Sequence, residues 1–200
     1  MIKIFRRNIN MTEFDILKLR SALLFIINKR GSIDIFHLFK ILYFADREHM
    51  AKYGRRIIND TFCAFENGPA PTLLYDLIKS KNGKRLSRIN REAFKSILDS
   101  FDRGTQDASN IVVSEMKPDD SYLSISDKEC LDRAYEENIN LSFGELSDKS
   151  HDSAWREVWN KCGRKNNRMN PYSSAKAAGA HDDTIKYMRE MEEIQSFLMS

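Results

Sequence analysis

The segment of residues 33–53 constrains the fold more than any other part of this sequence. With about 100° of rotation per residue, its apolar side chains fill most of the circumference of a helix. A helix that is apolar over so wide an arc belongs in the interior of a protein rather than on its surface. The sequence therefore predicts a central core helix that ends at Gly54. Its remaining polar side chains form a narrow polar stripe of His37, Lys40, Arg47 and Glu48.

One acidic residue, Asp46, falls on the apolar face of this predicted helix, beside Phe39 and Leu42. A buried carboxylate without partners is costly, so it must accept hydrogen bonds or pair with a cation. We expect Asp46 to pin a loop or a helix end. The competing interpretation is acid–base chemistry with His49, which follows one turn later on the same face. The candidate donors to the Asp46 carboxylate are Arg55, Arg56, Tyr75 and His151.

Helix signals dominate the rest of the chain, with fewer signals for strands. They predict a mainly α fold with a small β-sheet (α+β), built as a single compact helical domain over residues 1–200. We expect a core over about residues 12–160 and a C-terminal helical extension over residues 172–200. Residues 57–66 and 111–113 are the predicted strands, residues 67–71 a turn, and residues 81–88, 102–110 and 161–171 polar loops, the last one mobile. The predicted caps or first residues of the helices are Thr12, Ser32, Pro71 or Thr72, Asn90, Ser126, Ser142 and Asp182.

Composition restricts the class of protein without selecting an activity. The formal net charge is +3, which neither demands nor excludes a nucleic-acid partner. The three cysteines, Cys63, Cys130 and Cys162, are widely spaced and include no CxxC pair, which predicts reduced thiols in a cytoplasmic protein. No run approaches the roughly 20 apolar residues that cross a bilayer, and residues 1–10 lack the apolar core of a signal peptide. We therefore expect a cytoplasmic protein without a membrane partner.

Two basic stretches keep DNA binding open as an alternative. Phosphate contacts need clusters of this kind, although such runs are more often solvated faces. The last predicted helix is acidic, and patches of both signs suit steering toward a protein partner. A DNA-binding repressor of its own operon remains the runner-up. The basic residues are Lys81, Lys84, Arg85, Arg88, Arg91 and Lys95 in one stretch, and Arg156, Lys161, Arg164, Lys165, Arg168 and Lys176 in the other.

Chemistry at a nucleophile or a metal is a less favoured alternative. His151, Asp152 and Ser153 are adjacent, and members of a catalytic triad are rarely immediate neighbours. No GxSxG, HExxH or CxxC pattern is present. We therefore expect no enzyme and no cofactor. A hydrolase or metal enzyme would have to use Asp46, His49 and His151, with His37 as a further metal ligand.

Several phrases occur together in an order typical of one family. They are LYFADREH at residues 42–49, YGRRI at 53–57, NGPAP at 67–71 with LYD at 74–76, LSFGELS at 141–147, and SHDSAW at 150–155. In this order they resemble the Panacea domain, the family of the SocA-like antitoxins and of phage-associated proteins related to GepA. The resemblance covers about residues 19–159. One departure is Arg56, where the family pattern has proline.

The resemblance implies a mostly helical antitoxin without catalytic activity. Such a protein would neutralise a toxin encoded nearby by direct protein contact, and at least one member is similar to an adaptor that hands its toxin to a Clp-type protease. The resemblance also implies a set of motif residues that determine the fold and line the recognition surface. The motif residues are Tyr43, Asp46, His49, Gly54, Gly68, Pro69, Tyr75, His151 and Trp155.

Overall fold

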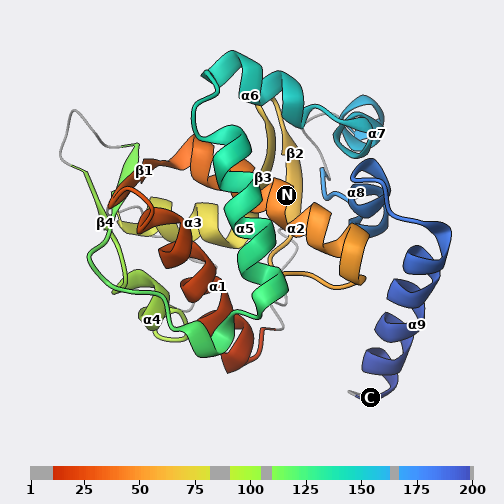
Figure 1. Cartoon of the computed structure of the whole chain (residues 1–200), viewed down its shortest axis with the longest axis horizontal. Helices are drawn as coiled ribbons and strands as arrows, with labels where there is room; N and C mark the ends of the chain where they lie inside the picture. Colours follow the sequence, from red (N-terminus) through yellow and green to blue (C-terminus); the bar gives the residue numbers. More distant parts are fainter. Residues whose placement is uncertain (1–10, 82–90, 105–109, 163–166, 199–200) are drawn as a thin grey trace, which may run out of the picture.

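Helix α2 (Ile35–Tyr53) runs through the centre of the fold, as its wide apolar arc predicts (Figure 1). Every residue from 38 to 46 is buried. The computed structural model describes residues 11–81, 91–104, 110–162 and 167–198. Helices α5 (Ile125–Asn138) and α8 (Pro171–Ala177) pack along α2. The described residues are mainly helical with small antiparallel sheets, which confirms the predicted α+β class.

Two helices begin at the predicted caps. Helix α1 (Glu13–Ile27) begins after Thr12, whose hydroxyl accepts the backbone N–H of Asp15 at 3.1 Å. Helix α6 (Phe143–Ser150) begins after Ser142, and the Glu145 carboxylate accepts the Ser142 backbone N–H at 2.8 Å. In each capping box the two residues satisfy each other's free backbone donors, so the helix start is encoded locally.

Two other predicted caps are wrong. Helix α2 is capped by Asp34 rather than Ser32, because residues Ser32–Asp34 form strand β1. Helix α5 is capped by Ser124 rather than Ser126, because Ser124 and Asp127 form the capping box there. At α2 the pairing of residues 32–34 in a sheet moves the helix start to Asp34, whereas at α5 the local capping box selects Ser124 over Ser126.

Three short strands form an antiparallel sheet in the order β1–β5–β4. Strand β5 (Ile111–Val113), predicted from its apolar run, pairs with β1 so that Val112 lies opposite Ile33. Strand β4 (Asp102–Arg103) pairs with the other edge of β5, whereas the sequence predicts a loop at this place. Strand β4 is too short and too polar to give an alternating pattern.

The second sheet is a hairpin of β2 (Phe62–Phe65) and β3 (Gly68–Pro71), hereafter the hairpin. The predicted turn over residues 67–71 is therefore wrong, because the turn is formed by residues 66–67 and Gly68–Pro71 is a strand. Prolines are tolerated in an edge strand, where a residue need not donate to a neighbour. The other edge of β2 is covered by a segment predicted to be mobile: the Ala64 N–H donates to the Asn167 carbonyl at 2.8 Å. Residues 167–169 thus complete the sheet.

The remaining elements surround this framework. Helix α3 (Thr72–Lys81) follows the hairpin, and α4 (Lys95–Leu98) buries Ile97 and Leu98 beside α1. The cap predicted for that segment, Asn90, lies outside the described residues. A 3-10 turn, η2 (Asp120–Tyr122), precedes α5, and α7 (Ser153–Cys162) follows α6.

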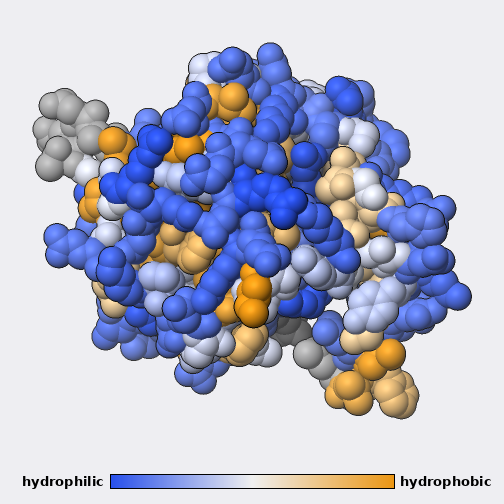
Figure 2. Space-filling view, viewed as in Figure 1, coloured by the Kyte–Doolittle hydropathy of each residue, from blue (hydrophilic) through white to orange (hydrophobic). Residues whose placement is uncertain are grey.

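Helix α9 (Asp182–Leu198) stands at one side of the molecule and carries the C-terminus (Figure 1). Its residues Ile185 and Met188 form a small buried cluster with Met50 and Ala175. Figure 2 shows a largely hydrophilic face, with apolar atoms gathered at the end of α9. No helix within the described residues has the length and apolar character that crossing a membrane requires.

Candidate functional site

The motif residues divide into two groups in the structure. The helix-end group lies at the C-terminal end of α2 and consists of Asp46, His49 and Gly54. The hairpin group surrounds β2 and β3 and consists of Tyr43, Gly68, Pro69, Tyr75, His151 and Trp155.

Asp46 holds the chain segment that follows α2. Its Oδ1 atom accepts the backbone N–H groups of Ile57 at 2.8 Å and of Ile58 at 3.1 Å, and the residue is 1% exposed. The prediction that Asp46 pins a loop is confirmed, but the donors are backbone groups rather than the predicted side chains. Burial raises the pKa of the Asp46 carboxyl, and the nearby Arg56 guanidinium opposes that shift. These hydrogen bonds give Asp46 a structural role, because they hold residues 57 and 58 against the end of α2.

His49 belongs to a different buried network. Its Nδ1 atom lies 2.8 Å from the Arg55 carbonyl, which fixes the proton on that nitrogen, and its Nε2 atom lies 3.0 Å from the Ser126 hydroxyl. The Asp127 carboxylate lies 3.2 Å from the same Nε2 atom. Burial lowers the pKa of His49. No hydrogen bond or ion pair joins Asp46 to His49 in the described part of the chain, so the acid–base pair considered from the sequence does not form.

The residues proposed for a metal site are also kept apart. His37 contacts Asp34 at 2.6 Å and the Leu141 carbonyl at 2.9 Å, whereas His151 lies at the hairpin. Across the described ranges, no group of three or more His, Cys, Asp or Glu side chains could hold a metal ion. The structure therefore does not assemble the ligand set that the metal alternative requires.

Gly54 ends α2 and allows α9 to pack closely against this point. Its φ of 66° lies in the left-handed region, which a glycine adopts without strain. A Cβ atom at this position would lie 2.5 Å from Cδ1 of Tyr187 on α9. The glycine is thus required twice, for its backbone conformation and for the close approach of a neighbouring helix.

Residues at the corner between α6 and α7 form hydrogen bonds to the turn of the hairpin. The Trp155 indole N–H donates to the Phe65 carbonyl at 2.9 Å, and Nε2 of His151 donates to the Glu66 carbonyl at 3.1 Å. The rings of His151 and Trp155 stack with centroids 3.7 Å apart, and Trp159 stacks on Trp155 at 5.3 Å. These contacts fix the hairpin on the helical core.

Tyr43 ties α2 to the same corner. Its hydroxyl donates to Oδ2 of Asp152 at 2.7 Å, and Arg47 pairs with that oxygen. The other carboxylate oxygen of Asp152 accepts the backbone N–H of Trp155 at 3.0 Å, which caps α7. Burial and the neighbouring carboxylate raise the pKa of Tyr43 well above its ordinary value. Asp152 therefore acts as a structural link rather than as a member of a triad.

The prediction that Lys40 belongs to a polar stripe on α2 is wrong, because Lys40 is buried. Its side chain is covered by the hairpin, and the residue is 2% exposed. The amine donates to the Pro69 carbonyl at 3.0 Å and lies 5.0 Å from the centroid of the Phe36 ring. Burial lowers the pKa of Lys40 to about 7. A helical wheel places Lys40 among polar residues of α2, but it cannot show that strand β3 of the hairpin packs over this residue.

Gly68 makes the approach of Lys40 possible. It has a φ of +95°, and a Cβ atom there would lie 2.6 Å from Nζ of Lys40 and 2.1 Å from Oγ of Ser150. Any larger residue would push the hairpin away from α2. Gly68 and Pro69 thus form the cradle that surrounds the buried amine.

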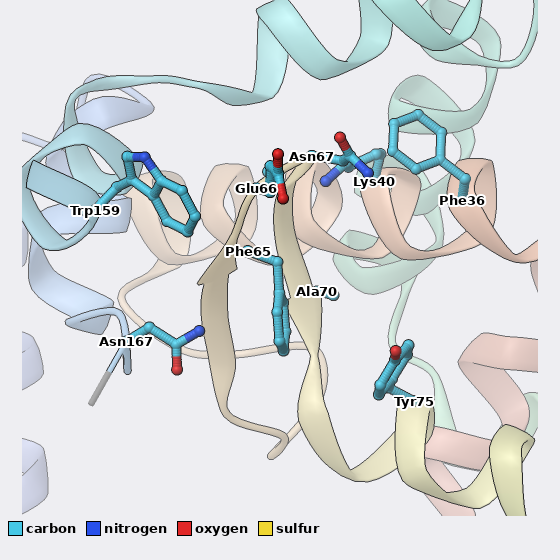
Figure 3. A pocket seen from close by; sticks show the side chains of 10 residues that line it. Phe36, Lys40, Phe65, Glu66, Asn67, Ala70, Tyr75, Trp159 and Asn167 are labelled. Carbon is cyan, nitrogen blue, oxygen red and sulfur yellow. The ribbon is translucent and has the colours of Figure 1, made fainter. Parts of the chain in front are cut away.

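An open groove of about 480 Å³ lies over this cradle, hereafter the aromatic groove (Figure 3). Phe65 lies between Trp159 of α7 and Tyr75 of α3, and Phe36 and Lys40 of α2 lie at one end. Sequence reasoning singled out Gly68 and Tyr75 of this site but missed most of the others, because they gather only through packing. The lining residues are Phe36, Lys40, Phe65, Glu66, Asn67, Gly68, Ala70, Tyr75, Trp159 and Asn167.

Several described members of the two basic stretches contact other residues of the protein. Lys84, Arg85 and Arg88 lie outside the described residues. Of the flanking residues, Lys81 pairs with Asp102 at 2.9 Å and Arg91 donates to the Ser80 carbonyl. Lys81 and Arg91 thus contact the protein itself. In the second stretch, Arg164 and Lys165 also lie outside the described residues, and Lys161 contacts Glu157 and Lys176 contacts Asp182.

The fold and the site define a mainly helical module, in which polar motif residues support an aromatic groove. Residues 38–156 match the model of the family described as antitoxin SocA-like, Panacea domain, and the chain belongs to this family. This match confirms the resemblance seen in the sequence and supports an antitoxin role in general. No curated protein and no solved structure matches the chain.

Proposed function

We propose that this chain is the antitoxin of a toxin–antitoxin pair and neutralises a toxin encoded nearby by direct protein–protein binding, without catalysing a reaction. The observation that carries the proposal is the aromatic groove. It lies over the hairpin, and the segment that matches the antitoxin family supplies most of its lining. The motif residues of the hairpin group hold the walls of this groove in place. The family match and the groove together support the proposal.

The chemistry of the groove suits contact with a protein. Tyr75 and Trp159 are half-buried and Phe65 is exposed, so aromatic surface remains available to a partner. Tyrosine, tryptophan and phenylalanine are enriched in protein interfaces, where a few such side chains supply most of the binding energy. Backbone carbonyls of the hairpin are satisfied by Trp155 and His151. The groove can therefore keep its shape while the partner docks.

Co-expression with the product of each neighbouring gene tests the proposal. One neighbouring product should arrest growth, the chain should restore growth, and a pull-down should recover a stoichiometric complex. Phe65→Ser and Trp159→Ala in the groove should weaken both rescue and binding by about tenfold or more. Ile125→Ser is the matched control, because Ile125 is 79% exposed outside the groove. Rescue that is equally insensitive to all three substitutions would place the interface elsewhere.

The adaptor role implied by the resemblance is a separate part of the proposal. If the chain hands its toxin to a Clp-type protease, the toxin should disappear more quickly in cells that contain both the chain and the protease. A pulse-chase measurement in strains with and without the protease separates this role from simple sequestration. A toxin lifetime that is equal in both strains, with growth still restored, would leave binding alone as the mechanism.

A further inference from the structure

The amine of Lys40 has fewer partners than a buried cation needs. A lysine ammonium carries several N–H donors, and the only hydrogen bond that Lys40 makes with the described residues is the one to the Pro69 carbonyl. It forms no ion pair with a carboxylate of the described residues, and the Phe36 ring supplies a weaker contact at 5.0 Å. A buried charge is costly unless it is paired, so the site is suited to an incoming anion.

The amine also lies at the buried end of the aromatic groove, which Lys40 helps to line. Lys40 lines the aromatic groove together with Gly68, whose missing side chain leaves the space that the Lys40 amine and the Ser150 hydroxyl occupy. Lys79 lies 3.9 Å from the centroid of the Tyr75 ring and adds a second positive charge near the groove. Glu66 contributes one negative charge at the turn of the hairpin. The groove therefore combines apolar walls with a cation at its buried end.

We propose that the aromatic groove binds an acidic side chain, Asp or Glu, on an apolar segment of the partner toxin. The carboxylate would pair with Lys40, and the flanking apolar side chains would lie against Phe65, Tyr75 and Trp159. This inference rests on the proposed function, because it names the feature of the toxin that the groove recognises.

The shape of the groove favours a peptide segment as the occupant. Figure 3 shows aromatic side chains on both sides of Phe65, so apolar groups can be held on either side of a central position. A volume of about 480 Å³ has room for a few side chains. A charge-assisted hydrogen bond is about twice as strong as a neutral one, so the amine should distinguish glutamate from glutamine. The pKa of about 7 supports this assignment, because an arriving carboxylate favours the protonated amine.

Two short peptides test the inference without the toxin. The full chain is titrated with acetyl-Phe-Glu-Leu-amide and with acetyl-Phe-Gln-Leu-amide, and binding is followed by NMR shifts. We expect the glutamate peptide to bind about tenfold more tightly near pH 6.5. Lys40→Met should abolish this preference, and Lys186→Met, which removes a lysine from exposed α9, should keep it. Equal affinities for the two peptides, or a preference that survives Lys40→Met, would overturn the inference.

A pH series on the unmodified chain provides a second measurement if the Lys40→Met variant does not fold. Among the described residues, the titratable or charged groups that face the amine are His151 from the α6–α7 corner and Glu66 from the hairpin. Burial lowers the pKa of His151, which moves its titration away from the pH range in which Lys40 loses its proton. The preference for the glutamate peptide should therefore decline across that range as Lys40 loses its proton. A preference that stays constant to pH 9 contradicts the pairing with Lys40.

The toxin assay separates this inference from the proposed function. If the wild-type chain and Lys40→Met neutralise the toxin equally well, the groove inference fails and the antitoxin role stands. If no neighbouring gene product is toxic, the antitoxin role fails, and the peptide titration still decides the chemistry of the groove. Loss of neutralisation in Lys40→Met, with full neutralisation by Lys186→Met, supports both.

Discussion

Replacing Lys40 with methionine should stabilise the fold near pH 7, although the residue lies in the proposed binding site. Burial lowers the pKa of Lys40 from 10.5 to about 7. At about 1.4 kcal/mol per pKa unit, this shift corresponds to a cost on the order of 5 kcal/mol for burying the charged amine. Methionine removes that cost but leaves the Pro69 carbonyl without its donor, a loss of about 1–3 kcal/mol. We therefore expect a net gain of about 2–4 kcal/mol in the free energy of unfolding.

Urea denaturation at several pH values measures this gain and its origin. Between the folded-state pKa of about 7 and the unfolded-state value of 10.5, the unfolded chain binds a proton that the folded chain does not. The Lys40 contribution to wild-type stability therefore rises with pH in this window, and Lys40→Met lacks that rise. The advantage of the variant should shrink above pH 7 and disappear by about pH 10, whereas Lys186→Met should follow the wild type at every pH.

One result would refute this reasoning. If Lys40→Met is less stable than the wild type at pH 7 and the difference does not change with pH, the amine is not a desolvated cation. The comparison uses differences between the variant and the wild type, so groups that titrate in both and do not interact with Lys40 cancel to first order. His151 is an exception, because the Lys40 charge lowers its pKa.

Three further substitutions address the framework of the site. Asp46→Ala should lower the free energy of unfolding by about 1–3 kcal/mol, because it leaves two buried backbone N–H groups without an acceptor; unchanged urea melting would contradict the assignment. Trp155→Ala should lower the free energy of unfolding by about 3–5 kcal/mol, since this residue is only 7% exposed. A variant that melts at the wild-type temperature but no longer binds the toxin would instead make Trp155 an interface residue. Gly54→Ala should lower the free energy of unfolding by about 1–2 kcal/mol, because alanine is strained in the left-handed conformation of this position. The added methyl group should also displace α9, which limited proteolysis would detect as faster cleavage within that helix. An unchanged digestion pattern would show that α9 does not depend on this contact.

The elements that could be predicted are those encoded by nearby residues. The capping boxes at Thr12 and Ser142 join residues three positions apart, so a local pattern contains all the information. The apolar arc of α2 is equally local, and it correctly places this helix in the core. The hydrogen-bonding role of Asp46 also follows from its place on that arc, although its backbone donors cannot be identified from the sequence.

The elements that could not be predicted depend on partners far away in the sequence. Strand β1 exists because Ile33 pairs with Val112, and the segment at residues 167–169 is ordered by its bonds to β2. Strand pairing of this kind leaves little trace in a short polar segment. The same limitation hides Lys40, whose burial is caused by a hairpin that begins more than twenty residues later.

The Gly68-Pro69 dipeptide has a different conformation in the structure from the one that the sequence predicts. In the sequence it indicates a turn, because glycine permits positive φ and proline interrupts regular structure. In the structure it lies in an edge strand, where the proline carbonyl is turned to the Lys40 amine and the absent glycine side chain makes room for it. One short phrase therefore provides both an acceptor and space for a buried cation. The hydrogen bond to Pro69 offsets only part of the cost of burying Lys40 in the core of α2. It also connects the family motif directly to the groove that we propose recognises the toxin.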